Sequence, residues 1–114
     1  MSNALRVALL GTGLYAAGAA AAATHDITIK MQKESFAPAK AAVVKGTRIT
    51  WTNNDTVPHS VTAADNRFDS GAILPGKTFQ WTANDSGTIA YHCIFHPSMT
   101  AVLTVRGSAK QSGK

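Results

Sequence analysis

Cysteine is nearly absent from this sequence, since Cys93 is the only one among 114 residues. A disulfide within one chain is therefore excluded. A lone cysteine pairs with a second chain, stays buried as an inert thiol, reacts, or binds a metal. Which of these applies is the first question about function.

Acidic residues and clusters of charge are also scarce. The chain has 11 lysines and arginines against 6 acidic residues, a formal net charge of +5, and the basic residues are scattered. No basic run and no aromatic platform interleaved with basic residues occurs, so the sequence argues against nucleic-acid binding. We expect a solvated basic surface that steers an acidic protein partner.

Long hydrophobic runs are confined to the N-terminus. Arg6 is the only charged residue before Asp26, and the run between them is rich in alanine and closes on small residues. This pattern is typical of a secretory signal peptide over residues 1–23. A membrane anchor is the alternative, but the run is short for a span and is diluted by glycines.

We therefore expect export to the periplasm, a mature chain from about Thr24 and no membrane insertion after cleavage. Residues 24–106 are predicted to form one domain. Residues 107–114 are predicted to be a flexible tail, since they lack large apolar side chains. Oxidising compartments normally use cysteines in pairs, so export makes the unpaired Cys93 more informative.

From Asp26 onward, short β-type runs alternate with turn clusters, and no long apolar stripe with helical spacing occurs. The pattern predicts an all-β fold, a small sandwich. The expected strands are residues 27–31, 41–46, 48–53, 59–63, 77–83, 88–93 and 100–105.

The alternation within residues 88–93 places Cys93 on the inward face, together with Ile89 and Tyr91. His92 falls on the opposite face and is interpreted as a surface histidine. Because Pro97 cannot join a central ladder, residues 94–99 are predicted to form a tight loop before the last strand.

Soft metal ligands gather in one stretch, YHCIFHPSMT, at residues 91–100. Cys93, His96 and Met99 follow one another at intervals of three, so a compact loop can curl their side chains around one ion. Thiolate, imidazole and thioether favour copper, and a cysteine with two histidines and a distant methionine is the arrangement of copper electron-transfer sites.

The second histidine has to come from elsewhere in the chain. His59, in NNDTVPHSV, is a better candidate than His25 at the expected mature N-terminus. A ligand from a distant segment would hold the site rigid between the cuprous and cupric states. The predicted metal ligands are His59, Cys93, His96 and Met99.

Two other interpretations compete with copper. Zinc also binds cysteine and histidine, but methionine is an unusual fourth ligand for zinc. Immunoglobulin-like sandwiches place a tyrosine two residues before a cysteine, as Tyr91 stands before Cys93, but they need a first cysteine that this chain lacks.

YHCIFHPSM with VPHSV upstream resembles the cupredoxins, the type 1 blue-copper proteins, and is most similar to amicyanins and related plastocyanin-like proteins. The short C-x-x-H-x-x-M spacing carries the likeness to amicyanins. Other segments resemble cupredoxins in the same order, namely residues 36–39, 45–61, 68–82 and 87–93.

The resemblance implies a Greek-key β-sandwich of seven or eight strands that binds one copper ion. His59, Cys93 and His96 would be the equatorial ligands, and Met99 the weak axial one. The protein would be a monomeric, non-enzymatic carrier of one electron between larger redox proteins, such as a dehydrogenase and a c-type cytochrome.

The resemblance also implies that His96 reaches the surface within an apolar patch, where the electron leaves. Pro58, Phe95 and Pro97 are expected to supply that patch. A copper-binding or storage protein is the alternative function, but it would need an open, Met-rich or His-rich site. An enzymatic copper site would need an open coordination position, which Met99 would fill.

Two features depart from the amicyanin pattern. Ser60 stands where amicyanins commonly have an asparagine that ties the histidine loop to the cysteine loop. Ile94 and Phe95 stand in place of a threonine and a proline between the cysteine and the second histidine.

Overall fold

Strands make up most of residues 25–107, the part of the chain that the computed structural model describes, and no helix occurs among these residues. The strands follow runs rich in β-branched and aromatic residues. They are β2 (Asp26–Gln32), β3 (Ser35–Ala37), β4 (Lys40–Val44), β5 (Arg48–Asn53), β6 (Thr62–Ala63), β7 (Thr78–Thr82), β8 (Gly87–Cys93) and β9 (His96–Arg106).

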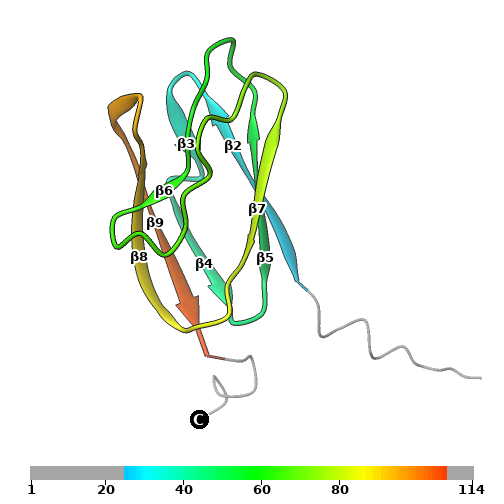
Figure 1. Cartoon of the computed structure of the whole chain (residues 1–114). Helices are drawn as coiled ribbons and strands as arrows, with labels where there is room; N and C mark the ends of the chain where they lie inside the picture. The colour runs from blue at the N-terminus through cyan, green and yellow to red at the C-terminus, as the bar shows by residue number, and fades with distance from the viewer. Residues whose placement is uncertain (1–24, 108–114) are drawn as a thin grey trace, which may run out of the picture.

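These eight strands form two four-stranded sheets that face each other (Figure 1). The strand order is β3-β2-β5-β7 in one sheet and β4-β9-β8-β6 in the other. β2 pairs with β5, and β4 with β9, in parallel, whereas the other pairs are antiparallel. The chain therefore crosses between the sheets, as a Greek-key sandwich requires. The predicted all-β sandwich of seven or eight strands is confirmed.

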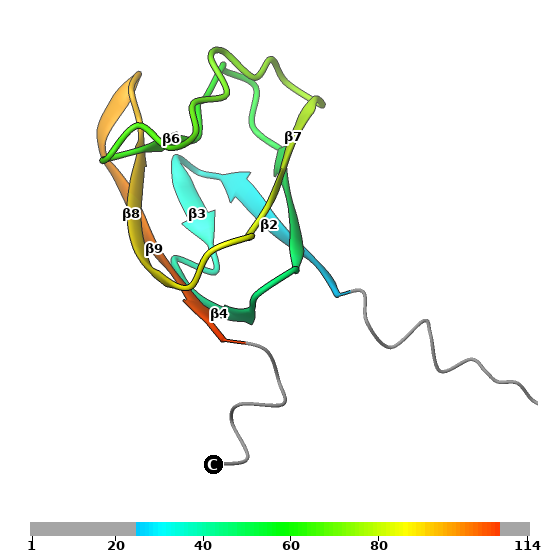
Figure 2. The ribbon, with the colours of Figure 1, turned by 60° about the horizontal axis from the view of Figure 1, so that its bottom comes forward.

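The apolar core lies between the two sheets, which curve around a shared interior in Figure 2. Ile49 and Trp51 of β5 face it from one side, and Tyr91 and Cys93 of β8 face it from the other, all at most 2% exposed. The alternate residues of β8 point outward, so His92 lies on the outer face, where it is half-buried. The predicted inward face of residues 88–93 is confirmed.

The prediction of a loop over residues 94–99 is corrected by the structure. Only Ile94 and Phe95 form a turn, and β9 begins at His96, which pairs with Cys93. The pairing then shifts, because His92 opposes Thr100, so residues 97–99 bulge out of the ladder. Proline is tolerated in such a bulge because it has no N–H to donate.

Two strand predictions also differ from the structure. The expected strand at 59–63 is reduced to β6, and His59 instead makes an isolated bridge to Ile73. β3 was not predicted, because it has only three residues and Pro38 follows it directly.

The predicted signal peptide at residues 1–23 lies outside the described residues, as does the predicted tail apart from Gly107. Among the residues that are described, none belongs to a helix long and apolar enough to cross a membrane.

A hydrogen bond between two aromatic residues joins the sheets across the core. Trp51 Nε1 donates to the hydroxyl of Tyr91 over 3.2 Å. The two rings also pack edge to face, with centroids 5.6 Å apart. Burial raises the pKa of Tyr91 to about 12, and the bond from Trp51 offsets only part of that rise.

We expect Tyr91→Phe to lower the free energy of unfolding by about 1–3 kcal/mol near neutral pH, because the buried Trp51 N–H loses its acceptor. Urea denaturation measures this loss. In the wild type, stability should also fall between the ordinary tyrosine pKa of 10.0 and about 12, because only the unfolded chain releases the phenol proton there. Tyr91→Phe should lack that alkaline fall.

Thr88→Val is the matched control, since it removes a hydroxyl from an exposed position of the same strand. If Tyr91→Phe is as stable as this control, the Trp51–Tyr91 bond does not contribute to the fold.

Candidate metal centre

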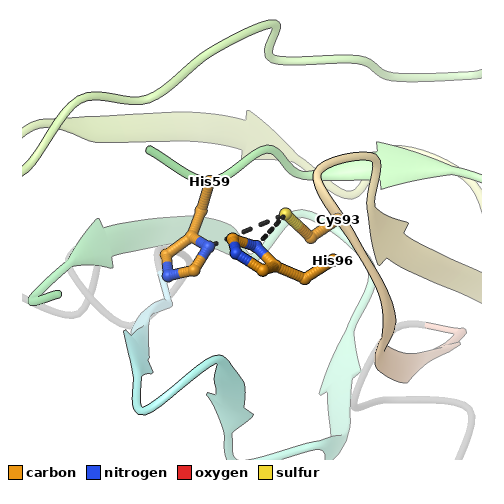
Figure 3. Close-up of side chains that lie close together, drawn as sticks. All are labelled: His59, Cys93 and His96. Atoms are coloured by element: carbon orange, nitrogen blue, oxygen red, sulfur yellow. Dashed lines mark hydrogen bonds between the residues drawn. The ribbon is translucent and has the colours of Figure 1, made fainter. Parts of the chain in front are cut away.

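Three segments bring one side chain each to the end of the sandwich where the β8–β9 turn lies (Figure 3). Cys93 is the last residue of β8 and His96 the first of β9. His59 precedes β6, and its backbone is fixed by two hydrogen bonds, since His59 N donates to Ile73 O over 3.1 Å and Ile73 N to His59 O over 2.7 Å. All three side chains are therefore carried by paired backbone.

The spacing of the donor atoms fits one metal ion. Cys93 Sγ lies 3.7 Å from His59 Nδ1 and 3.6 Å from His96 Nδ1, and all three atoms lie within 4.8 Å of one another. Nitrogen and sulfur ligands bind metals at about 2.0–2.3 Å, so two of them about 120° apart are separated by about 3.7 Å. One thiol and two imidazoles suit copper. His59, Cys93 and His96 thus form a possible site for one copper ion.

Two of the three clustered side chains are fully buried, and the third reaches the surface. His59 and Cys93 have no exposed surface. The His96 side chain is 23% exposed, and its ring lies edge to face with that of His59, with centroids 4.9 Å apart. Met99 is buried in β9, three residues beyond His96. The one exposed ligand edge therefore belongs to His96.

Asp55 orients the buried histidine. Its Oδ2 lies 2.6 Å from His59 Nε2. Burial raises the pKa of Asp55, but hydrogen bonds from Glu34 N–H, His59 and Lys33 N–H together hold it below its ordinary value. An ionised carboxylate only accepts, so His59 Nε2 carries the proton and Nδ1 is left free to bind a metal.

Ser60 ties the histidine segment to the cysteine turn. Its backbone N–H donates to Cys93 Sγ over 3.3 Å, and its hydroxyl oxygen accepts from Ile94 N–H over 2.9 Å. Serine is shorter than asparagine, but Ser60 is fully buried and reaches Ile94 directly.

The hydroxyl of Ser60 is itself held by a polar chain. Thr62 Oγ1 donates to Asp69 Oδ1 over 3.2 Å, and Ser60 Oγ lies 2.9 Å from Thr62 Oγ1. Since Thr62 gives its only proton to the carboxylate, Ser60 has to donate to Thr62. Ser60 Oγ is therefore oriented as an acceptor toward Ile94 N–H.

Three of the four predicted ligands lie together in the structure, namely His59, Cys93 and His96, but the residues that orient His59 were not predicted from the sequence. Asp55 stands four residues before His59, and a carboxylate so close to a predicted ligand was a signal that could have been used. Asn53 was also missed. Its Nδ2 donates to Val57 O and to Ile73 O over 2.8 Å each, which shapes the loop that carries Asp55.

The two remaining histidines lie outside the cluster, as predicted. His92 is on the outer face of its sheet. His25, the first described residue, is exposed, and its carbonyl accepts a hydrogen bond from Arg48 N–H.

Large apolar side chains are exposed on loops at the end of the sandwich that carries His96. The exposed large ones are Val57 (37%), Leu74 (54%), Ile94 (52%) and Phe95 (47%). Their loops lie at the same end of the sandwich in Figure 1. Pro58 and Pro97, which were predicted to supply an apolar patch together with Phe95, are exposed as well. We call Val57, Leu74, Ile94 and Phe95 the apolar rim.

Comparisons with known proteins agree with this fold and site. The model of the cupredoxin-like domain matches residues 5–105. Plastocyanin of Scenedesmus fuscus is 26% identical over 71% of this chain and 100% of that protein. Amicyanin-alpha of Methylorubrum extorquens is 26% identical over 86% of this chain and 90% of its own length.

Two solved structures are similar to this one. A purple cupredoxin from Nitrosopumilus maritimus is 27% identical, with a TM-score of 0.64 over 68% of this chain and 97% of its own. The Cu(I) form of a methionine-to-alanine mutant of amicyanin is 25% identical, with a TM-score of 0.66 over 70% of this chain and 81% of its own.

We expect Ser60→Ala to lower the free energy of unfolding of the metal-free protein by about 1–3 kcal/mol, because Ile94 N–H and Thr62 both lose a partner. Urea denaturation gives the loss, and hydrogen exchange of the Ile94 amide shows where it arises. Ser98→Ala removes an exposed hydroxyl from the nearby bulge and serves as the control. Equal protection of the Ile94 amide in wild type and Ser60→Ala would show that Ser60 does not join the two segments.

Proposed function

This chain belongs to the cupredoxin-like family, and on that premise we propose that it is a soluble periplasmic protein that carries one electron between larger redox proteins. A bound copper ion would supply the Cu(I)/Cu(II) couple. His59, Cys93 and His96 would hold it as equatorial ligands, and Met99 as the weak axial one. No bond of a substrate would be made or broken, so the protein would not be an enzyme.

One observation carries this proposal, namely that one thiol and two imidazoles converge on a single point. Sγ and the two Nδ1 atoms have the spacing that a bound ion requires. Ligands that need not move between oxidation states keep the reorganisation cost of electron transfer low. Paired backbone, Asp55 and Ser60 supply this rigidity.

The surroundings of the site favour electron transfer over catalysis. His59 and Cys93 are fully buried, and Met99 is 2% exposed, so the protein keeps water and small molecules away from the metal. The His96 side chain is 23% exposed at the end of the sandwich that carries the apolar rim, and it would be the exit for the electron. A small apolar contact of this kind suits brief docking.

The partners would be a redox donor and a redox acceptor, such as a dehydrogenase and a c-type cytochrome, as proposed from the likeness to amicyanin. Removal of residues 1–23 would take away only Arg6, and the remaining net charge of +4 would speed the approach of acidic partners, an effect that would weaken as salt is added. We propose that the protein acts as a monomer after residues 1–23 are removed.

Copper binding or storage, with the metal as cargo, is the second candidate. A cargo site should open easily to release its ion, whereas two of the three clustered ligands here have no exposed surface. The closed site is the reason to prefer the electron carrier.

We expect the Cu(II)-loaded protein to be intensely coloured from thiolate-to-copper charge transfer, and Cys93→Ser to abolish the colour while the sandwich still folds. Visible absorption measures the colour, and far-ultraviolet circular dichroism measures the fold. His92→Ala, which changes the neighbouring histidine on the outer face, should keep the colour. A colourless wild-type complex, or colour that survives in Cys93→Ser, would contradict the electron-carrier proposal.

Met99→Leu should keep the colour but raise the reduction potential, because a weak donor to Cu(II) is lost. Cyclic voltammetry measures the shift. Met31→Leu is the control, since Met31 is the other buried methionine of the described core. If both variants have the wild-type potential, Met99 is not an axial ligand.

A further inference from the structure

The turn between β2 and β3 has an unfavourable backbone for its sequence. Gln32 pairs with Ser35, so only Lys33 and Glu34 connect the two strands. Both are left-handed, with φ of 56° and 55°. Such turns normally use asparagine or glycine, because a side chain in this conformation is strained. Strain of this kind persists only where the surroundings hold it, and it gathers at functional sites.

The side chain that holds this turn comes from a distant segment. Lys33 N–H donates to Asp55 Oδ1 over 2.7 Å, and Glu34 N–H donates to Asp55 Oδ2 over 3.0 Å. Hydrogen bonds from two successive amides to an ionised carboxylate are stronger than neutral ones. Each oxygen of Asp55 therefore receives one amide, which leaves the carboxylate a single orientation.

The same carboxylate contacts the metal site. Asp55 Oδ2 accepts from Glu34 N–H and also lies 2.6 Å from His59 Nε2. Asp55 N–H donates to Asn53 Oδ1 over 2.9 Å. This bond from its own loop holds the backbone of Asp55 and does not involve its carboxylate. The turn amides are thus what orients the carboxylate toward His59.

We propose that the strained Lys33–Glu34 turn is a positioning element of the metal site. Its two amides fix Asp55, and Asp55 fixes the His59 ring with Nδ1 directed at Cys93 Sγ. The proposal rests on the proposed metal-binding function. It assigns a role to a turn that contributes no ligand and lies more than 20 residues before the first one.

Lys33 is the residue to change, because the Glu34 carboxylate lies 3.8 Å from His96 Nε2 and its removal would alter the site directly. Lys33→Ile places a β-branched residue where φ is positive, which is strongly disfavoured. Lys33→Asn is the conservative variant, since asparagine tolerates this conformation. Asn66→Ile adds the same strain at φ of 66°, in a turn between Asp65 and Arg67 that contacts no ligand.

The first readout uses the metal-free protein and nuclear magnetic resonance. We expect Lys33→Ile to speed the hydrogen exchange of His59 Nε2–H, while Lys33→Asn and Asn66→Ile leave it at the wild-type rate. The second readout is Cu(I) affinity by competition with a chelator. Lys33→Ile should weaken Cu(I) binding about 5- to 30-fold, which is the factor that corresponds to the free-energy cost of holding a side chain in the left-handed conformation.

Asp55→Asn tests whether the turn acts on His59 through Asp55. If the turn acts through Asp55, adding Lys33→Ile to Asp55→Asn should weaken Cu(I) binding no further. If Lys33→Ile does not fold, Asp55→Asn alone tests the link, because the amides of Lys33 and Glu34 and His59 Nε2–H should then all exchange faster.

The proposal is overturned if Lys33→Ile lowers only the unfolding midpoint, as Asn66→Ile does, with unchanged imidazole exchange and Cu(I) affinity. Additive losses in the double variant would also overturn it. A wild-type protein without thiolate-to-copper absorption would instead refute the proposed function, and the exchange of His59 Nε2–H in the metal-free protein would still test the turn.

Discussion

The convergence of one thiol and two imidazoles on a single point is the constraint on which the rest of this structure depends. Cys93 and His59 are buried without exposed surface, and their donor atoms lie 3.7 Å apart. Burying polar atoms this close together in an apolar core costs free energy unless each atom is hydrogen-bonded or binds a metal. The three side chains meet at one end of the sandwich, where the last residue of β8 and the first of β9 supply two of them and the segment before β6 supplies the third.

Fixing the ligands takes partners that are distant in the sequence. Ser60 joins the His59 segment to the backbone after Cys93, and Asp55 joins His59 to the turn after β2. Both residues have short side chains whose oxygen atoms accept hydrogen bonds from backbone N–H groups. Each residue therefore fixes a loop and one of the clustered side chains together. The rigidity needed for electron transfer therefore comes from hydrogen bonds between loops as well as from the two sheets. Of the three clustered side chains, only His96 reaches the surface.

Much of this could be predicted from the sequence, because alternation and donor chemistry are local signals. Period-two spacing predicted the inward face of β8. The spacing of Cys93, His96 and Met99 predicted a metal site, for which His59 was the better candidate of the remaining histidines. The bulge at residues 97–99 and the short β6 could not be predicted, since they depend on pairing between strands. The hydrogen-bond partners of Asp55 could not be predicted from the sequence either. The amides of Lys33 and Glu34 donate to that carboxylate only because the turn is left-handed.

The central claim is that this chain holds one copper ion in a site that stays the same in both oxidation states. X-ray absorption at the copper edge, on the Cu(I) and Cu(II) forms of the same sample, tests it most directly. The account predicts one sulfur and two imidazole nitrogens at about 2.0–2.3 Å in both forms, with no change in ligand number. A first shell of oxygen atoms, or the gain or loss of a ligand on reduction, would contradict it.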